Sequence, residues 1–430
     1  MLREMNEGFQ VEGRRGVAPL RRTRFYLGAA VTNYKQLESE VLPQYFKLEK
    51  KIRTGAEFII TQMGYDSQKL NELIAYMRHR NLDVPVIANV YVLSPGAARA
   101  FHGNRIPGCV VTDALLELVE TRSASPDRGR RFFLELAAKQ IAVARGLGYQ
   151  GAYIGGLHEP ADFEELLGVV ASIRAGDWKD FAREICFSQP GEFFFFEREA
   201  DSGLICPDQV NRAYLDSLAP GRRDELKGRL PLGYKLSRSA HDSVFRDGTR
   251  LHARMQRLFK VLDRSPQLAR GVHGLEHAVK RVLFDCRDCG DCSLQDIAYL
   301  CPESQCAKNQ RNGPCGGTHQ GTCEVYDQPC IWSRAYDRLK PYGEEADFVE
   351  RAPVLKDGAL EKSSAWGNYF LGRDHHGKAA VSAAAEARSL RSRPRPRTSD
   401  TAEIDSVDSS ETAGVAKEPG DGTSRPDPDR

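Results

Sequence analysis

The chain has 430 residues, of which 41% are hydrophobic and 28% are charged, and its formal net charge is +2. This length exceeds what one hydrophobic core usually supports, so we expect two or three structural units. The nearly balanced charge, with no basic stripe of interleaved aromatic residues, argues against nucleic-acid binding, and no apolar run approaches the roughly 18 residues that cross a membrane. The start MLREMNEGFQ lacks an apolar core and a small-residue cleavage site, which predicts a cytoplasmic protein.

After a helix and linker expected over residues 1–22, residues 23–215 alternate short apolar runs with amphipathic helical patterns. Strands are expected at 24–31, 57–63, 85–92 and 151–155. Helical patterns separate the strands, with a longer helix over about 130–145 and another that Pro160 opens. Such βα units are typical of a parallel sheet. The fold class predicted is α/β: a TIM-type (βα) barrel of which about half, the last four strands, is present, since a full barrel has eight.

The remaining segments are less regular. The stretch EICFSQPGEFFFFE over residues 184–197 predicts a further strand or a buried segment, with its phenylalanines in the core. Residues 216–283 form a helical connector, whose helices over about 251–262 and 268–283 we expect to dock the next unit onto the barrel. Residues 346–430 are a C-terminal extension with few large apolar residues beyond about 373, where disorder is expected.

Between the helical connector and the C-terminal extension, residues 284–345 contain eight of the eleven cysteines. They are Cys286, Cys289, Cys292, Cys301, Cys306, Cys315, Cys323 and Cys330. The C-x2-C-x2-C opening brings three thiolates close together, as a metal site requires. A disulfide framework is the alternative, but it needs an oxidising compartment. The segment is therefore predicted to be a metal-binding module with enough ligands for two four-thiolate sites, holding either zinc or iron–sulfur clusters.

Five phrases carry a resemblance to a known family. GAAVTNYK, KLEKKIRTGAEFIITQMGYD, ANVYVLS and GAYIGGLHEPADF resemble successive strands of the flavin-dependent methylenetetrahydrofolate reductases, and the cysteine pattern with NGPCGG is similar to a C-terminal module fused to some of them. The resemblance implies a TIM barrel that holds FAD at the carboxyl ends of its strands. It also implies reduction of 5,10-methylenetetrahydrofolate to 5-methyltetrahydrofolate in one-carbon and methionine metabolism, with NAD(P)H or reduced ferredoxin as the electron donor.

The same resemblance implies roles for individual residues. Gln62 matches the glutamine that hydrogen-bonds the folate or nicotinamide stacked on the flavin, and an amide offers both a donor and an acceptor for this. Ala29 and Ala30 match small residues that admit the cofactor, and the pair Lys50 and Lys51 matches a basic pair near its dinucleotide portion. Glu159 stands at about the position where the family has an arginine that engages the folate tail.

The chain departs from the family pattern before its first expected strand. The resemblance places a general-acid glutamate and a pterin-facing aspartate on the first four strands of the barrel, and neither has a counterpart here, so no catalytic residue is assigned. We expect an N-terminally truncated reductase. The alternatives are a non-catalytic iron–sulfur or zinc accessory subunit of a reductase complex, and a folate-binding scaffold without turnover. A partner subunit or a homo-oligomer would supply the missing strands.

Overall fold

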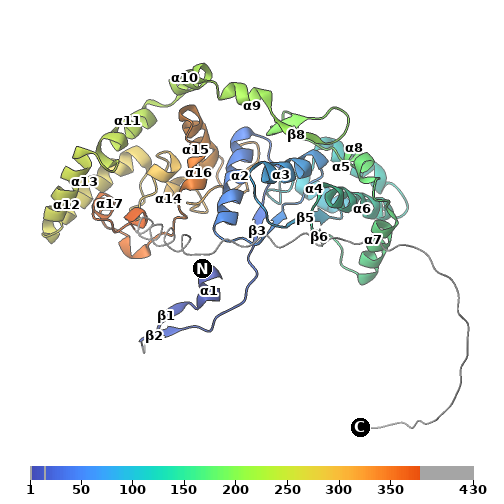
Figure 1. Ribbon diagram of the computed structural model, residues 1–430, viewed down its shortest axis with the longest axis horizontal. Helices are drawn as coiled ribbons and strands as arrows, with labels where there is room; N and C mark the ends of the chain where they lie inside the picture. Colours follow the sequence, from blue (N-terminus) through green and yellow to red (C-terminus); the bar gives the residue numbers. More distant parts are fainter. Residues whose placement is uncertain (1, 14–15, 378–430) are drawn as a thin grey trace, which may run out of the picture. The chain divides into compact units, whose positions relative to one another are not determined.

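The computed structural model describes residues 2–13 and 16–377 (Figure 1). Its strands are β1 (Gln10–Gly13), β2 (Gly16–Pro19), β3 (Gly28–Val31), β4 (Phe58–Thr61), β5 (Val86–Tyr91), β6 (Gly151–Gly155), β7 (Phe196–Arg198) and β8 (Ile205–Val210). The helices of the first half are α1 (Leu2–Glu7), α2 (Glu38–Arg53), α3 (Ser67–His79), α4 (Pro95–His102), α5 (Asp113–Ser123), α6 (Arg130–Leu147), α7 (Pro160–Ser172) and α8 (Trp178–Glu184).

Short helices dominate the second half. The α-helices there are α9 (Arg212–Ser217), α10 (Pro220–Arg229), α11 (Leu232–Ala240), α12 (Arg250–Leu262), α13 (Pro266–Phe284), α14 (Pro302–Gln305), α15 (Ile331–Leu339), α16 (Asp347–Glu350) and α17 (Ala365–Phe370). A π-helical turn, η1 (His241–Phe245), and three 3-10 turns, η2 (Gln295–Ile297), η3 (Lys340–Tyr342) and η4 (Gly358–Leu360), complete the described part. No helix within it is both long and apolar enough to cross a membrane.

The central sheet is parallel and has the order β3-β4-β5-β6. All four strands expected from the sequence form, and the helices expected at 130–145 and after Pro160 are α6 and α7. Two of the connections in this unit have a cause in the local sequence. Gly55, at φ +104°, follows the end of α2, and the Asp66 carboxylate accepts a hydrogen bond from Gln68 N (2.8 Å) to cap α3, as an N-cap residue does.

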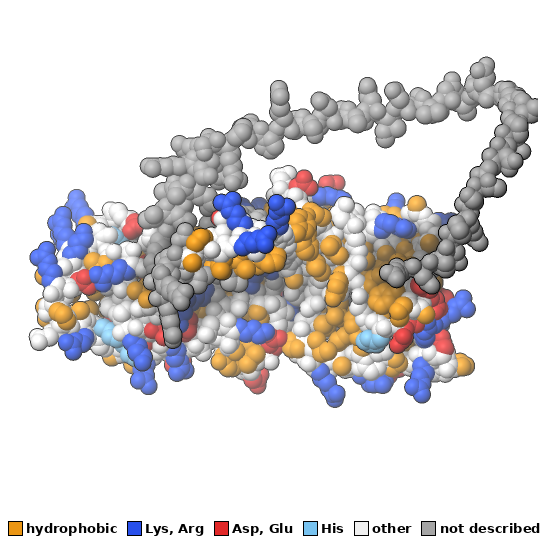
Figure 2. All heavy atoms as spheres, turned by 90° about the horizontal axis from the view of Figure 1, so that it is seen from below, with side chains coloured by type: hydrophobic (Ala, Val, Ile, Leu, Met, Phe, Trp, Pro, Cys, Tyr) orange, Lys and Arg blue, Asp and Glu red, His pale blue; other side chains and the backbone are white. Residues whose placement is uncertain are grey.

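The two faces of this sheet differ in burial. Side chains that alternate along β4 and β5 toward α2, α3 and α6 are buried, Ile59 completely. The side chains between them, among them Phe58 and Ile60, are only partly buried, and Tyr153 on β6 is 59% exposed. Figure 2 shows a face of the molecule on which hydrophobic side chains gather near the middle. The described sheet is thus open on one face and at both edge strands.

The phenylalanine run packs in the core beside α3, as expected. Phe194, Phe195 and Phe196 are buried, and the backbone N–H of Phe195 donates to the Glu72 carboxylate (2.6 Å). Phe196 begins β7, which pairs antiparallel with β8. The segment predicted as a strand or buried stretch is therefore irregular and mostly partly buried, and its buried phenylalanines lead into a short strand.

The cysteine-containing segment contacts the sheet unit directly. Helix α2 packs against α15 and α16, and the Tyr336 hydroxyl donates to Glu38 Oε1 (2.6 Å) across that contact. The two connector helices expected near 251–262 and 268–283 form as α12 and α13, but α12 packs against α17 and α13. The cysteine-containing segment therefore contacts the sheet unit through α2, whereas the sequence had predicted a contact through the two connector helices.

The chain stays ordered past the point where disorder was expected. Arg373 forms an ion pair with Asp263 (Nη1 to Oδ1, 3.0 Å), and Asp374 and His375 are buried. The rest of that expectation, from residue 378 onward, lies outside the described residues.

Candidate functional site

Gln62 lies directly after β4, at the carboxyl end of the sheet. Its backbone N–H donates to Val31 O (2.7 Å), and its side-chain Oε1 accepts from Met63 N (3.0 Å). The side chain borders a hollow of about 450 Å³ over the open face of the strands. The lining residues are Gly28, Ala29, Ala30, Val31, Thr32, Phe58, Ile60, Thr61, Gln62, Asn89 and Tyr153. Three sequence-predicted residues, Ala29, Ala30 and Gln62, therefore share one cavity.

The NGPCGG segment of the cysteine module reaches the same strand ends. A Cβ on Gly316, which has φ +90°, would lie 2.5 Å from Thr32 Oγ1. A Cβ on Gly108 would lie 3.2 Å from Gly316 O and 3.3 Å from Gln62 Nε2. These close approaches require glycine. They also place Gln62 and Gly316 of the module beside Gly108, so the two most distinctive sequence features meet at the strand ends.

Two lysines, Lys35 buried and Lys47 partly buried, hold this segment in place. Lys47 Nζ on α2 donates to Pro314 O (2.8 Å) and Gly313 O (3.3 Å). Lys35 Nζ, four residues beyond β3, donates to Thr318 O. Burial lowers the pKa of both amines, and the neighbouring Cys315 thiol acts to raise it. Sequence reasoning missed both lysines; for Lys35 the available signal was its place just past a strand end, where barrel enzymes carry functional groups.

The eight cysteines fall into two sets that are separate in space. Cys286, Cys289, Cys292 and Cys301 interact electrostatically with one another, and we call them the first cysteine set. Cys306, Cys315, Cys323 and Cys330, the second cysteine set, are linked in the same way to each other or to shared lysines. Every cysteine of the chain is a free thiol, so the disulfide alternative does not describe this structure.

The surroundings of both sets suit metal-bound thiolates. Burial raises the pKa of the Cys292 thiol to about 11, so a cation has to replace the proton if the sulfur is to ionise. Backbone N–H groups point at sulfur in both sets, from Asp288 to Cys286 and from Gly317 to Cys315, each at 3.4 Å. The buried amine of Lys280 supplies positive charge beside the first set.

The sulfur atoms are more widely spaced than one zinc ion requires. Zn–S bonds of roughly 2.3 Å in a tetrahedron put sulfurs about 3.8 Å apart. Among the described residues, which include all the cysteines, no three sulfurs lie within 4.8 Å of one another. An iron–sulfur cluster separates its thiolates further, because several irons and sulfides lie between them.

The other predicted residues lie outside the strand-end cavity. Lys50 and Lys51 are in the last turn of α2, where burial lowers both pKa values to about 8. Lys50 interacts with Asp296 of the module, and Lys51 Nζ donates to Ala30 O at the edge strand. Glu159 is exposed and is the residue before α7, just beyond β6. The structure brings together Gln62 and the two alanines, and Lys51 contacts Ala30 from outside the cavity. Lys50 and Glu159 do not line this cavity.

A larger hollow of about 530 Å³ lies between the connector helices and the module. Aromatic side chains, among them Tyr234, Tyr299, Trp366 and Tyr369, form much of its wall, and Cys292 of the first cysteine set borders it. No sequence motif indicated this space, because its lining comes from segments far apart in the chain. They are α11, η1, α13, residues 292–305, α15 and residues after 364. This largely apolar hollow lies beside the first cysteine set and has room for a flat ligand or a protein side chain.

A parallel sheet with a hollow over its open face, which reaches the carboxyl ends of β3 and β4, defines an α/β protein compatible with a TIM-type barrel, the class in which ligands bind at the carboxyl ends. Comparison with protein families is more specific. Residues 31–153 match the family model described as methylenetetrahydrofolate reductase, and residues 265–357 match the one described as methylene-tetrahydrofolate reductase C terminal. No curated protein matches the chain. The chain belongs to the methylenetetrahydrofolate reductase family, and the second match contains all eight clustered cysteines.

Proposed function

We propose that the protein takes part in the FAD-dependent reduction of 5,10-methylenetetrahydrofolate to 5-methyltetrahydrofolate. The observation that carries this proposal is the position of Gln62, which borders the cavity over the open face of the strands and lies with Gly316 of the cysteine module beside Gly108. Family membership supplies the folate reductase chemistry. The cavity supplies a place where that chemistry fits.

The residues around the cavity suit an isoalloxazine ring. Gly28, Ala29 and Ala30 leave the edge strand without bulky side chains, and FAD bound over them would supply hydride transfer. The Gln62 amide can donate one hydrogen bond and accept another from a folate or nicotinamide ring stacked there. The hydrogen bond from Met63 N engages only the Oε1 atom of the Gln62 side chain. The NH2 group of the amide is therefore available to orient the substrate.

The remaining site proposals follow the family pattern. Lys50 and Lys51 would offset the phosphate charge of the cofactor, which requires their side chains to leave Asp296 and Ala30 O. Glu159, exposed at the end of β6, would contact the folate tail in place of an arginine. Neither role adds a general acid.

We also propose that the four strands are half of an eight-stranded barrel. The burial of alternate side chains toward the helices, with the opposite face left open, is the pattern of barrel strands whose inner face is unfilled. Unpaired edge strands are a liability in isolation. Complementary strands from a partner subunit would cover the face and bring the missing acidic residues, whereas a second copy of this chain would cover the face alone.

For the cysteine module we propose an iron–sulfur cluster in each set. Two sets of four thiols offer the ligands that two clusters require, and the amide-to-sulfur bonds are a means of tuning cluster potential. Clusters would let reduced ferredoxin, as well as NAD(P)H, deliver electrons. Iron and acid-labile sulfide in the purified protein would distinguish clusters from zinc.

The test of the reaction is Gln62→Ala. Loss of one hydrogen bond to the substrate is worth roughly 1–3 kcal/mol, so kcat/KM for oxidation of 5-methyltetrahydrofolate with an artificial acceptor should fall about 10- to 100-fold. The FAD content should stay at the wild-type value. The control is Gln150→Ala, an exposed amide just before β6 at the opposite end of the strands. An unchanged rate in the Gln62 variant removes that residue from the site.

A second function, an electron-transferring accessory subunit, is favoured by the open sheet face together with the two cysteine sets. The cofactor content and activity of the wild-type protein distinguish these functions. If it contains iron and sulfide but retains no FAD, the accessory role is supported. If it retains FAD yet does not oxidise 5-methyltetrahydrofolate, a folate-binding scaffold is supported.

A further inference from the structure

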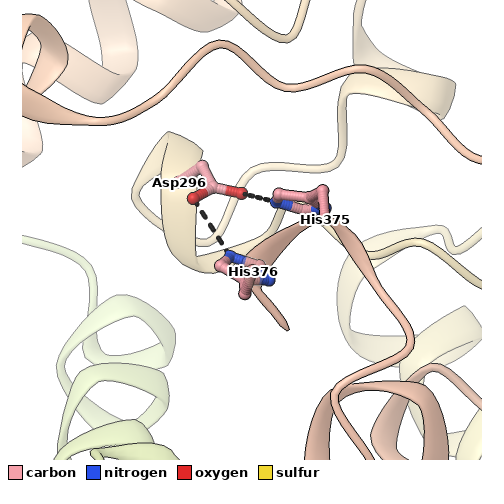
Figure 3. Close-up of side chains that lie close together, drawn as sticks. All are labelled: Asp296, His375 and His376. Carbon is pink, nitrogen blue, oxygen red and sulfur yellow. Dashed lines mark hydrogen bonds and ion pairs between the residues drawn. The ribbon is translucent and has the colours of Figure 1, made fainter. Parts of the chain in front are cut away.

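Two adjacent histidines near the end of the described chain meet a buried carboxylate. Asp296, in η2, lies between His375 and His376 (Figure 3). His375 Nε2 is 2.9 Å from Asp296 Oδ2, and His376 Nε2 is 3.2 Å from Asp296 Oδ1. The three side chains are 12%, 9% and 23% exposed, in the order Asp296, His375 and His376. Their ligand atoms all lie within 4.8 Å of one another.

The second nitrogen of each imidazole also faces a carboxylate. His375 Nδ1 contacts Asp291, and His376 Nδ1 is 3.0 Å from Asp374 Oδ2. Histidines that bind metals almost always donate their other N–H to a carboxylate or carbonyl, which fixes the tautomer and the ring orientation. Here both rings have such a partner, and both Nε2 atoms are turned to the same side chain.

We propose that Asp296, His375 and His376 bind a divalent first-row transition-metal ion through the Asp296 carboxylate and two Nε2 atoms. Ligands about 2.0–2.2 Å from such an ion lie roughly 2.9–3.4 Å apart when they are neighbours in the coordination shell. The two distances from Asp296 fall in that range. Two imidazoles with one carboxylate suit zinc or ferrous iron.

The site is distinct from both cysteine sets in its ligands. It has nitrogen and oxygen donors and no sulfur. Its two parts are 79 residues apart in the chain, so the ion would tie residues 374–376 to the loop that follows Cys292. Closing so long a loop restricts the unfolded chain, and metal binding would therefore stabilise this end of the module.

The same contacts also describe an ion-pair chain without a metal. In that arrangement both rings carry two protons; burial acts to lower the pKa of His376, but Asp296 and Asp374 raise it to about 9. The two arrangements differ in metal content, and the experiment is built on that difference.

The full-length protein and the double variant His375→Gln/His376→Gln would be analysed for metals after purification and after exchange with Co²⁺. We expect the double variant to lose one equivalent of zinc or iron per chain, with the acid-labile sulfide content unchanged. In the Co²⁺ form it should lose weak ligand-field bands but no thiolate-to-cobalt charge transfer. The matched control is His102→Gln, since His102 pairs with Asp113 (2.7 Å) but has no second histidine beside it.

A milder variant protects the test against misfolding. Asp374→Asn keeps Asp296, His375 and His376 and removes the charge of the partner of His376 Nδ1, so the metal affinity should fall about 10- to 100-fold. The amide oxygen of this variant can still accept the hydrogen bond that Gly377 N donates to Asp374 (3.3 Å). Far-ultraviolet circular dichroism and free-thiol counts show whether the variants fold. Equal metal content in wild type and double variant, with both folded, overturns the proposal and leaves the ion-pair chain. Failure of the folate reaction would not change this result, because the readout is metal bound to nitrogen and oxygen.

Discussion

At the scale of single residues, several carboxyl groups are buried beside too few positive charges and hydrogen-bond donors to offset the loss of hydration. Glu192 is the clearest case, because burial raises its pKa to about 7, while Lys69 acts to lower it and Asp66 to raise it. Its Oε2 accepts a hydrogen bond from Gln189 N (2.9 Å), which a neutral acid or an amide could also accept. The protonated form is therefore the one that the fold prefers.

The raised pKa predicts how Glu192 affects stability. Below pH 4.5, its ordinary value, Glu192 is protonated in both states and adds no penalty. As the pH rises toward 7, the unfolded chain ionises first, so the free energy of unfolding falls. We expect Glu192→Gln to be more stable than wild type at pH 8 by about 2–3 kcal/mol and equal to it near pH 4. Urea denaturation at both pH values measures this; a constant difference contradicts it. Glu199→Gln, an exposed control, should show neither effect.

At the scale of elements, the sequence predicted what depends on local patterns. The run FIIT gives β4 and the apolar spacing gives α12 and α13, because side-chain periodicity reflects burial on one face. It could not predict that Lys35 reaches Thr318, which is 283 residues away, or that His375 and His376 meet Asp296. Those contacts depend on how the module folds back on the sheet, and no local pattern encodes that. Gln62 was found only because a family motif marks it.

The lysine contacts predict a selective effect on the second cysteine set. Lys47→Met removes the donor for Gly313 O and Pro314 O, and leaving these carbonyls unpaired should cost about 1–3 kcal/mol. We expect faster loss of metal from the second set to a chelator, with the first set unaffected. Metal release followed by absorbance, and urea denaturation, test this. Lys227→Met, at a lysine paired with Asp224 on exposed α10 (2.9 Å), should behave as wild type. Equal release from both sets would contradict the assignment.

The division into two sets predicts that cysteine variants fall into two classes. Cys289→Ser should remove the metal of the first set, and Cys323→Ser that of the second, so each variant should keep about half of the wild-type metal. Destabilisation should accompany each loss, because site formation and folding are linked. Elemental analysis with sulfide determination provides the measurement, and Cys206→Ser outside the module is the control. Complete loss in either single variant would mean that the eight thiols form one site.

At the scale of the whole molecule, the open face of the sheet is the feature that the fold leaves unexplained. Residues on the helix side of β4 are buried, while Ile60 on the other side borders the strand-end cavity. An apolar surface of this kind marks an interaction site in most soluble proteins. The proposed half-barrel and the proposed reaction both depend on what covers it.

The open face predicts association through β4. Ile60→Asp should change the free energy of unfolding of the isolated chain by less than about 1.5 kcal/mol, because the site is partly exposed. The same substitution should weaken association of the chain with a second copy or with a barrel partner, so that more of the variant is monomeric. Ile59→Ala, on the fully buried side of the same strand, should cost about 2–5 kcal/mol instead. Sedimentation velocity and urea denaturation separate the two effects. Leu232→Asp, at a leucine on α11 that is 75% exposed, should leave the assembly intact. If wild type and Ile60→Asp sediment alike as monomers, and no partner co-purifies with wild type, the sheet is not half of a barrel completed by another chain.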